Sequence, residues 1–439
     1  MSFSSLKDFF TKELKALVSD ESTPLMTVLS LPYIMKSARC GFDRVSIFFS
    51  KHSEELLDLT FSDEADKVIS SNSFSILMIG DERILMPLFD NGLFLDIAAK
   101  ILTTPNVPAS KIGRLVSLMQ VCFSTLQGGA TESCGFIYRL LPFCGNPSVF
   151  NFFGSICGEE ENFESTQHWL NEIGFAEYIF LEFENVDFSY VSKEENVFKD
   201  PVFNLYLCLY QLISKCCENE ILKNSFLKKK LVTILKHDFD NPPDFLKTAR
   251  WNAIKAATCK DLALPLLIII PDALEVLTEN FTKLKSYHVS ALEFITKMMI
   301  LENATYDLLI KSSMPQLLIT LVVNFEYSTI LHSAFLNFVE IGLKHKNFAE
   351  NLVMYYTPVV VNCSFTDLNR VLKPCFIKTM QLLIKKGKKD KKLKAALRNT
   401  PGYKKFVDGP MEEYLDVIKS SYGGEAPGLM MKKLKGFFT

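Results

Sequence analysis

The side chains that could do chemistry are the cysteines and histidines, of which the 439 residues contain 11 and 6. Cys144 and His168 are the residue types of a cysteine nucleophile and its general base. A zinc site could use Cys134, Cys144, Cys157 and His168, but consecutive members are 10, 13 and 11 residues apart. Zinc ligands usually come in pairs only a few residues apart, and the chain has no C-x-x-C spacing. We therefore interpret these cysteines as packing residues and expect no metal or cofactor site.

Other groups with catalytic potential also have structural explanations. Gly128–Thr131 lacks the Gly-Lys-Ser/Thr that follows in a phosphate-binding loop and the strand that precedes one. The acidic pairs Asp81–Glu82 and Glu412–Glu413 fall where helices are predicted to start, and the helix macrodipole favours acidic residues there. No residues form a recognisable catalytic motif, and the chain is predicted not to be an enzyme.

The charge of the chain is balanced overall but not along its length. It carries 48 basic and 50 acidic residues, a formal net charge of -2, which argues against a nucleic-acid-binding protein. Lys385–Lys394 nevertheless holds seven lysines in ten residues. This run could be a solvated junction, a contact for an acidic partner or anionic membrane surface, or a nucleic-acid contact, although it lacks interleaved aromatics. We expect a weak contact with an acidic surface at most.

Apolar runs in the sequence are short. The longest uncharged one, Leu262–Ile270, has nine residues, whereas about 20 are needed to span a bilayer. The first 17 residues mix charged and aromatic side chains and lack the apolar core of a secretory signal. These features predict a protein of the cytoplasm, with the nucleus as a second compartment, that is not integral to a membrane.

Helical periodicity continues along almost the whole chain. Apolar residues recur every three or four positions in more than twenty short runs, separated by Gly, Pro, Asn and Asp. Two helices per about 40 residues is typical of armadillo and HEAT repeats. We predict an all-α fold, an armadillo/HEAT-like α-solenoid whose helix pairs form a right-handed superhelix. It would span residues 1–384, with an exposed loop at 184–201, and a basic helical tail would follow at 385–439.

Three stretches carry specific expectations. Cys134–Cys157 is predicted to hold two short helices, Phe136–Leu141 and Val149–Ile156, joined by a Pro/Gly/Asn turn. Ile221–Leu235 is predicted as one amphipathic helix. Leu262–Leu277 is predicted as one helix that is apolar on all sides and therefore buried between two layers, with its prolines as kinks.

The first of these stretches also resembles a known family. FIYRLLPFCGNPSVFNFFGSIC, followed at Thr166–Phe183 by TQHWLNEIGFAEYIFLEF, is similar to the SAPS family, the regulatory subunits of the type-2A-like Ser/Thr phosphatase called protein phosphatase 6. The resemblance rests on the aromatic-Leu-Leu-Pro turn with Cys144, the helix start at Asn146–Phe150 and the aromatic run that ends at Cys157. A second patch, Ile330–Leu343, resembles a later helix of that family.

The resemblance implies an armadillo-like scaffold that binds a phosphatase catalytic subunit and directs it to substrates. The metals and the chemistry would belong to that partner. Polar and aromatic residues at helix starts and turns are then candidates for the partner-binding surface, and the alternative for each is a cap or a packing role. These candidates are Arg114, Arg139, Asn146, Ser148, Arg250 and Trp251.

Two other functions stay open at this point. Armadillo-like arrays serve many partners, so the same scaffold could be an adaptor in transport or trafficking that holds its basic tail on an acidic partner or membrane. An unrecognised hydrolase would require cysteines and histidines to converge in a pocket.

Overall fold

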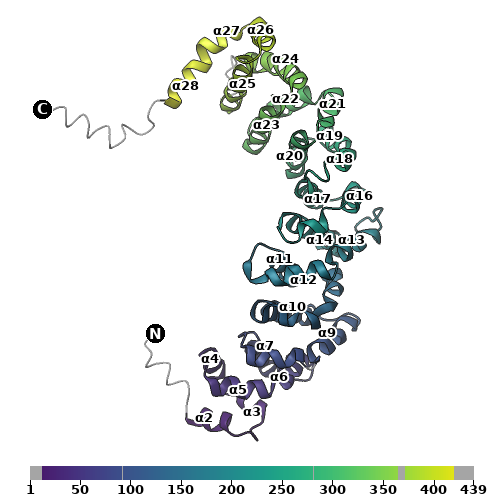
Figure 1. The fold of residues 1–439 in the computed structure, drawn as a ribbon, viewed down its shortest axis with the longest axis vertical. Helices are drawn as coiled ribbons and strands as arrows, with labels where there is room; N and C mark the ends of the chain where they lie inside the picture. The colour runs from purple at the N-terminus through teal and green to yellow at the C-terminus, as the bar shows by residue number, and fades with distance from the viewer. Residues whose placement is uncertain (1–11, 91, 280, 364–370, 420–439) are drawn as a thin grey trace, which may run out of the picture. The chain divides into compact units, whose positions relative to one another are not determined.

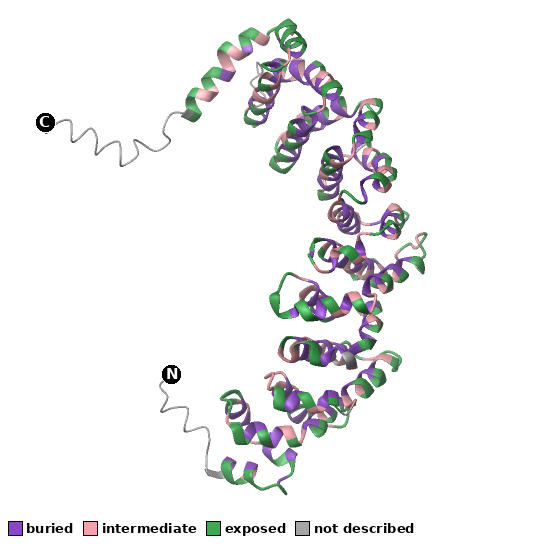
Figure 2. Cartoon of the chain, in the orientation of Figure 1, coloured by how far each residue is buried: buried purple, intermediate pink, exposed green. Residues whose placement is uncertain are grey.

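The computed structural model of the chain describes residues 12–90, 92–279, 281–363 and 371–419. All regular elements within these ranges are helices, so the predicted all-α solenoid is confirmed (Figure 1). The described residues belong to two compact units, one ending at Ala257 and one beginning at Thr258. Each unit is a stack of short helices, and Figure 2 shows buried residues where neighbouring helices face each other.

Unit 1 has its longest helices in its central and C-terminal parts. Its elements are α2 (Lys12–Ser19), α3 (Leu25–Leu29), α4 (Ile34–Arg39), α5 (Asp43–Lys51), α6 (Ser53–Phe61), α7 (Lys67–Leu77), α8 (Glu82–Asp90), α9 (Leu93–Thr103), α10 (Ala109–Leu126), η2 (Gln127–Ala130), η3 (Glu132–Phe143), α11 (Pro147–Ile156), η4 (Glu161–Phe163), α12 (Glu164–Glu172), α13 (Phe175–Glu184), η5 (Val197–Lys199), α14 (Pro201–Glu218), α15 (Lys223–Phe226), α16 (Lys229–Lys236) and α17 (Asp244–Ala257). The elements labelled η2 to η5 are 3₁₀-helices.

The longer helices of unit 1 pack in succession, α10 on α11, α11 on α14 and α14 on α17. The contact between α14 and α17 is the most extensive. Leu209, Leu212 and Ile213 of α14 are fully inaccessible to solvent, and burying such a side chain contributes about 1.5–3 kcal/mol. Unit 1 is therefore held together by apolar stripes that its helices share with their neighbours.

Unit 2 contains the long helices of the C-terminal half. Its elements are α18 (Ala263–Leu266), η6 (Leu267–Ile269), α19 (Ile270–Thr278), α20 (Ser286–Leu301), α21 (Ala304–Lys311), α22 (Met314–Asn324), α23 (Thr329–Gly342), α24 (Lys346–Cys363), α25 (Lys373–Gly387), α26 (Lys391–Asn399), α27 (Tyr403–Phe406), the π-helical turn η8 (Val407–Met411) and α28 (Glu412–Lys419). One row of helices runs α20, α23, α25, and a second row runs α22, α24, α26.

Two glycines set the helix spacing in unit 2. A β-carbon added at Gly342 would lie 2.9 Å from the Phe348 ring and from Leu352, so α23 and α24 approach closely there. A β-carbon at Gly387 would lie 2.8 Å from Leu397, which brings α26 onto the end of α25. The start expected for the basic tail, residue 385, therefore falls inside α25, and the lysine-rich segment continues into packed helices.

Several helices predicted from the sequence differ in type or in bounds from the helices of the structure. Phe136–Leu141 lies in the 3₁₀-helix η3, which runs on to Phe143, because Gly135 and Pro142 disfavour the α-helix. Ile221–Leu235 divides into α15 and α16, because the backbone leaves the helical conformation at Leu227 and is extended at Lys228.

The prediction that Leu262–Leu277 is one helix buried on all sides is wrong. It divides into α18, η6 and α19, since Pro265 and Pro271 cannot donate helical hydrogen bonds. Leu264 and Ile268 are 67% and 52% exposed. The stretch is therefore buried at Leu266, Ile269 and Ile270 but open to solvent at Leu264 and Ile268.

The stretch 184–201, predicted as an exposed loop, is non-helical from Asn185 to Asn196 but is organised around a buried carboxylate. Asp200 is fully inaccessible and accepts hydrogen bonds from the Tyr190 hydroxyl at 2.8 Å and the Ser192 hydroxyl at 2.5 Å. Its other oxygen accepts from the backbone N–H groups of Val202 and Phe203, which caps α14. The loop is thus tied to the helix that follows it.

Candidate functional site

The turn that leads into α11 is built by Asn146. Its Oδ1 accepts a hydrogen bond from the Ser148 backbone N–H at 2.9 Å, and its Nδ2 donates to the Ala109 carbonyl at 3.4 Å. Asn146 therefore caps α11 and joins it to the start of α10. Ser148 is exposed, and a β-carbon at Gly113 would lie 3.2 Å from its Oγ, so it packs over α10.

Arg114 connects three helices. Its Nη1 donates to the Thr60 carbonyl of α6 and to the Ser70 hydroxyl of α7, both at 2.6 Å. The guanidinium also lies 5.4 Å from the centre of the Phe74 ring. Through these Nη1 hydrogen bonds, half-buried Arg114 positions α10 against α6 and α7.

Arg250 and Trp251 are 3% and 1% exposed. The expectation that they lie on a partner-facing surface is therefore wrong. The burial of Arg250 could have been predicted from the sequence, because position 250 falls within the apolar stripe of α17 formed by Leu246, Ala249, Ala253 and Ile254. Arg250 instead binds the end of α16, as described in the Discussion.

Arg139, like Ser148, is a candidate that the structure leaves exposed. It lies on η3, exposed, with its guanidinium 6.0 Å from the centre of the Tyr138 ring. Tyr138 in turn stacks on Tyr178 of α13, with ring centres 4.3 Å apart and planes within 9°. Leu181 is 47% exposed and lies one turn after Tyr178, on the same side of α13. We call Tyr138, Arg139, Tyr178 and Leu181 the Tyr–Arg patch.

Sequence reasoning missed Tyr138, Tyr178 and Leu181 as site residues. A signal was present, because the buried stripe of α13 contains Phe175, Ala176, Ile179, Phe180 and Phe183. Tyr178 and Leu181 are large residues that fall outside this stripe. The stacking of Tyr178 on Tyr138 could not be found from sequence, because it depends on η3 packing against α13.

The cysteines considered for chemistry are buried. Cys134, Cys144 and Cys157 are at most 1% exposed. Burial raises the pKa of the Cys134 and Cys144 thiols well above the ordinary value, with smaller contributions from nearby thiols. His168 is exposed on α12 and lines a shallow groove with Glu161 and Glu164, so it does not meet Cys144. Within the described ranges, no three His, Cys, Asp or Glu side chains gather in a way that could hold a metal ion.

This burial predicts a graded reactivity of the thiols. Exposed Cys40 should be alkylated by iodoacetamide at about pH 8, whereas Cys208, whose pKa burial raises to about 11, should react slower by on the order of a hundredfold. Because a raised pKa keeps the thiol protonated, the labelling rate of Cys208 should rise with pH toward 11. Peptide mapping by mass spectrometry measures both rates. Equal rates in the folded protein would contradict this assignment, and labelling in urea provides the unfolded reference.

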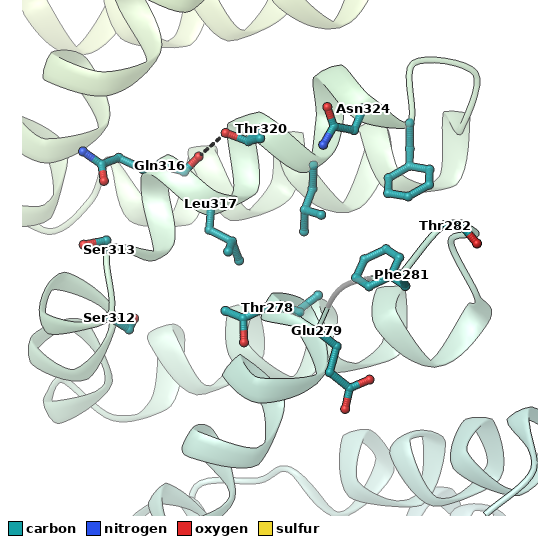
Figure 3. Close-up of a pocket in the computed structure, with 13 residues that line it drawn as sticks. Thr278, Glu279, Phe281, Thr282, Ser312, Ser313, Gln316, Leu317, Thr320 and Asn324 are labelled. Atoms are coloured by element: carbon teal, nitrogen blue, oxygen red, sulfur yellow. Dashed lines mark hydrogen bonds between the residues drawn. The ribbon is translucent and has the colours of Figure 1, made fainter. Parts of the chain in front are cut away.

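Unit 2 has a groove of about 600 Å³, lined by both polar and apolar side chains, between the end of α19, the segment before α20, and α22 (Figure 3). Phe281 closes one end and stacks on Phe325, with ring centres 5.4 Å apart. The hydroxyls of Thr278 and Thr320 donate to carbonyl groups of their own helices. These hydroxyl groups are therefore engaged in helix hydrogen bonds and are not placed as nucleophiles.

In the part of the chain that the structure describes, no single helix combines the length and apolar composition of a transmembrane span. The consecutive helices α21 and α22 meet the criteria only together, with a bend of 67° between them.

Comparisons with known proteins give structural likeness alone. No family model matches the chain, and no curated protein matches it. A chain from the crystal structure of an engineered protein is similar at 10% identity and a TM-score of 0.46, covering 86% of this chain and 98% of that one. A chain from a study of a phosphorylation switch that controls the interaction between cadherin and beta-catenin is similar at 10% identity and a TM-score of 0.41, covering 87% and 81%.

Proposed function

We propose that the chain is a non-catalytic scaffold that binds a type-2A-like Ser/Thr phosphatase catalytic subunit and directs it to substrates. The sequence resemblance of Phe136–Cys157 and Thr166–Phe183 to the SAPS family motivates the choice of partner. The all-α solenoid supports a scaffold role, since such stacks present long surfaces to partners. We place the protein in the cytoplasm, with the nucleus as a second compartment.

The observation that carries the proposal is the Tyr–Arg patch. Tyr138 and Arg139 lie in the first resembling segment, and Tyr178 and Leu181 lie in the second. The structure brings the two segments together through the stacked tyrosines. Arg and Tyr are the residue types that most often dominate binding energy in protein interfaces, and stacking holds the Tyr138 ring in place before a partner arrives. We assign the patch as the centre of the phosphatase contact.

A pull-down tests this proposal. The tagged protein is recovered from its native cell, the eluate is assayed for phosphatase activity, and its proteins are identified by mass spectrometry. The double substitution Arg139→Glu and Tyr178→Ala should reduce the recovered phosphatase activity by about tenfold or more, because it removes two anchor side chains. Arg39→Glu is the matched control, since Arg39 is an exposed arginine on α4 and should have no effect. Circular dichroism checks that all variants fold.

The result separates the proposal from its alternative. Recovery of a phosphatase that is insensitive to the double substitution would overturn the patch as the contact. Recovery of coat, nuclear-transport or lipid-associated proteins without any phosphatase would overturn the phosphatase assignment. That second result would favour an adaptor in transport or trafficking, which uses the same solenoid.

A further inference from the structure

The ends of α23 and α25 form a basic groove in unit 2. It has a volume of about 280 Å³ and is lined by Glu340, Leu343, Lys344, Leu382, Lys385, Lys386 and Lys389. Leu343 is buried and Leu382 is half-buried, so the groove has an apolar floor. We call this site the lysine groove.

The lysine groove carries a net charge of +3, from four lysines and one glutamate. Lys344 and Lys385 are exposed, and among the described residues neither they nor Lys386 and Lys389 form a salt bridge with a carboxylate. The C-terminal ends of α23 and α25 carry partial negative charge, which favours a lysine near each end. This effect accounts for one or two of the lysines but not for all four. Four ammonium groups around one recess leave an excess of positive charge.

The structure separates six of the seven lysines of the run into two groups, and the seventh, Lys388, caps α25 outside the groove lining. Lys385, Lys386 and Lys389 line the groove, whereas Lys391, Lys392 and Lys394 belong to α26. Lys392 is already paired with Glu350 of α24 at 2.7 Å. Lys344 comes instead from α23, outside the run, and joins it only because α23 packs against α25. The lysine groove therefore contains only part of the lysine run and one lysine from outside it.

We propose that the lysine groove docks an acidic peptide segment of a protein partner, whose carboxylates meet the lysines and whose apolar side chain lies on Leu382. An anionic membrane fits less well, because the leucines are recessed and cannot enter a bilayer. Nucleic acid also fits less well, because the lining has neither arginine nor aromatic side chains. The inference concerns unit 2 and does not depend on the phosphatase proposal.

The test uses the full chain and a fluorescein-labelled peptide in which Glu and Leu are arranged as an amphipathic helix. Fluorescence anisotropy should show binding that weakens with salt. Lys385→Glu, Lys386→Glu and Lys389→Glu together should weaken binding by about tenfold or more. The control Lys391→Glu, Lys392→Glu and Lys394→Glu makes the same change of charge on α26 and should weaken it by less than about threefold.

Two further variants keep the result interpretable. Glutamate is unfavourable at the C-terminal end of α25 because of the helix macrodipole, so the first triple could also destabilise the helix. Gln at positions 385, 386 and 389 removes the positive charges without adding negative ones, and it should also weaken binding. Lys344→Gln should weaken binding although Lys344 lies outside the run. Equal losses for the groove and control triples, no effect of Lys344→Gln, or no binding of the peptide would each overturn the proposal. Phosphatidylserine vesicles and single-stranded DNA are tested in parallel, and groove-dependent binding of either in preference to the peptide would overturn it too.

Discussion

Arg250→Ala is expected to destabilise unit 1 by about 3–5 kcal/mol. The Nε of Arg250 donates to the carbonyls of Leu235 and His237 at 3.0 and 3.1 Å, and Nη2 donates to the Lys236 carbonyl at 3.1 Å. Its Nη1 pairs with Asp238, also at 3.1 Å. These carbonyls lie at the C-terminal end of α16, where the helix itself supplies no further backbone donors. Alanine would leave these carbonyls, and the Asp238 carboxylate, without the donors of a buried guanidinium.

Native-state hydrogen exchange of α16 and α17 measures this loss locally, which suits a chain of two units. Arg250→Lys should recover only part of the stability, because one ammonium cannot reproduce the planar set of donors. Arg139→Ala, at an exposed arginine of the same unit, is the matched control and should leave exchange unchanged. If Arg250→Ala behaved like Arg139→Ala, the role of Arg250 at the end of α16 would be refuted.

Asp200→Ala is expected to cost about 2–4 kcal/mol and to release the segment before α14. It removes the cap of α14 and leaves the hydroxyls of Tyr190 and Ser192 without their acceptor. Protease cleavage within 185–199 and hydrogen exchange at the start of α14 measure both effects. Asp187→Ala is the control within the same segment. The Asp187 carboxylate is exposed and accepts hydrogen bonds from the N–H and hydroxyl of Ser189, so its loss should be much smaller. Equal sensitivity of the two variants would contradict the assignment.

The same carboxylate predicts a pH dependence. Burial raises the pKa of Asp200, but the hydrogen bonds from Ser192, Phe203, Tyr190 and Val202 outweigh it and hold the pKa below its ordinary value of 3.8. A lowered pKa in the folded state means that ionised Asp200 contributes its stability fully above the ordinary value. This contribution is lost as pH falls through the lower folded pKa. Asp200→Asn should therefore differ most from the natural chain at neutral pH and least in strong acid.

The helices with continuous apolar periodicity could be predicted from the sequence almost to their ends. The apolar periodicity of residues 202–217 matches α14, which runs from Pro201 to Glu218, because Pro201 fixes the start and the stripe persists to Cys217. The exact helix type could not be predicted where Gly and Pro interrupt the pattern, as in η3. There, tertiary packing decides between α and 3₁₀ turns.

The candidate site was less accessible to sequence reasoning. Long side chains such as Arg114 and Arg250 were expected on a surface, but the pattern does not show which carbonyl groups a neighbouring helix leaves without partners. Lys344 could not be assigned to the lysine groove, since this requires knowing that α23 and α25 are neighbours. Arg139 was expected at the turn before Asn146, but the structure places it within the 3₁₀-helix η3, exposed and beside Tyr138 and Tyr178.

The stacking of near neighbours in sequence has a consequence for how the protein is made. Extensive contacts join elements only a few positions apart, such as α6 with α7, α14 with α17 and α20 with α23. Low contact order of this kind permits fast folding, because short loops close at little entropic cost. Unit 1 is complete at Ala257, so it can fold on the ribosome while the helices of unit 2 are still being synthesised. Its apolar stripes would then be covered before the second half of the chain could compete for them.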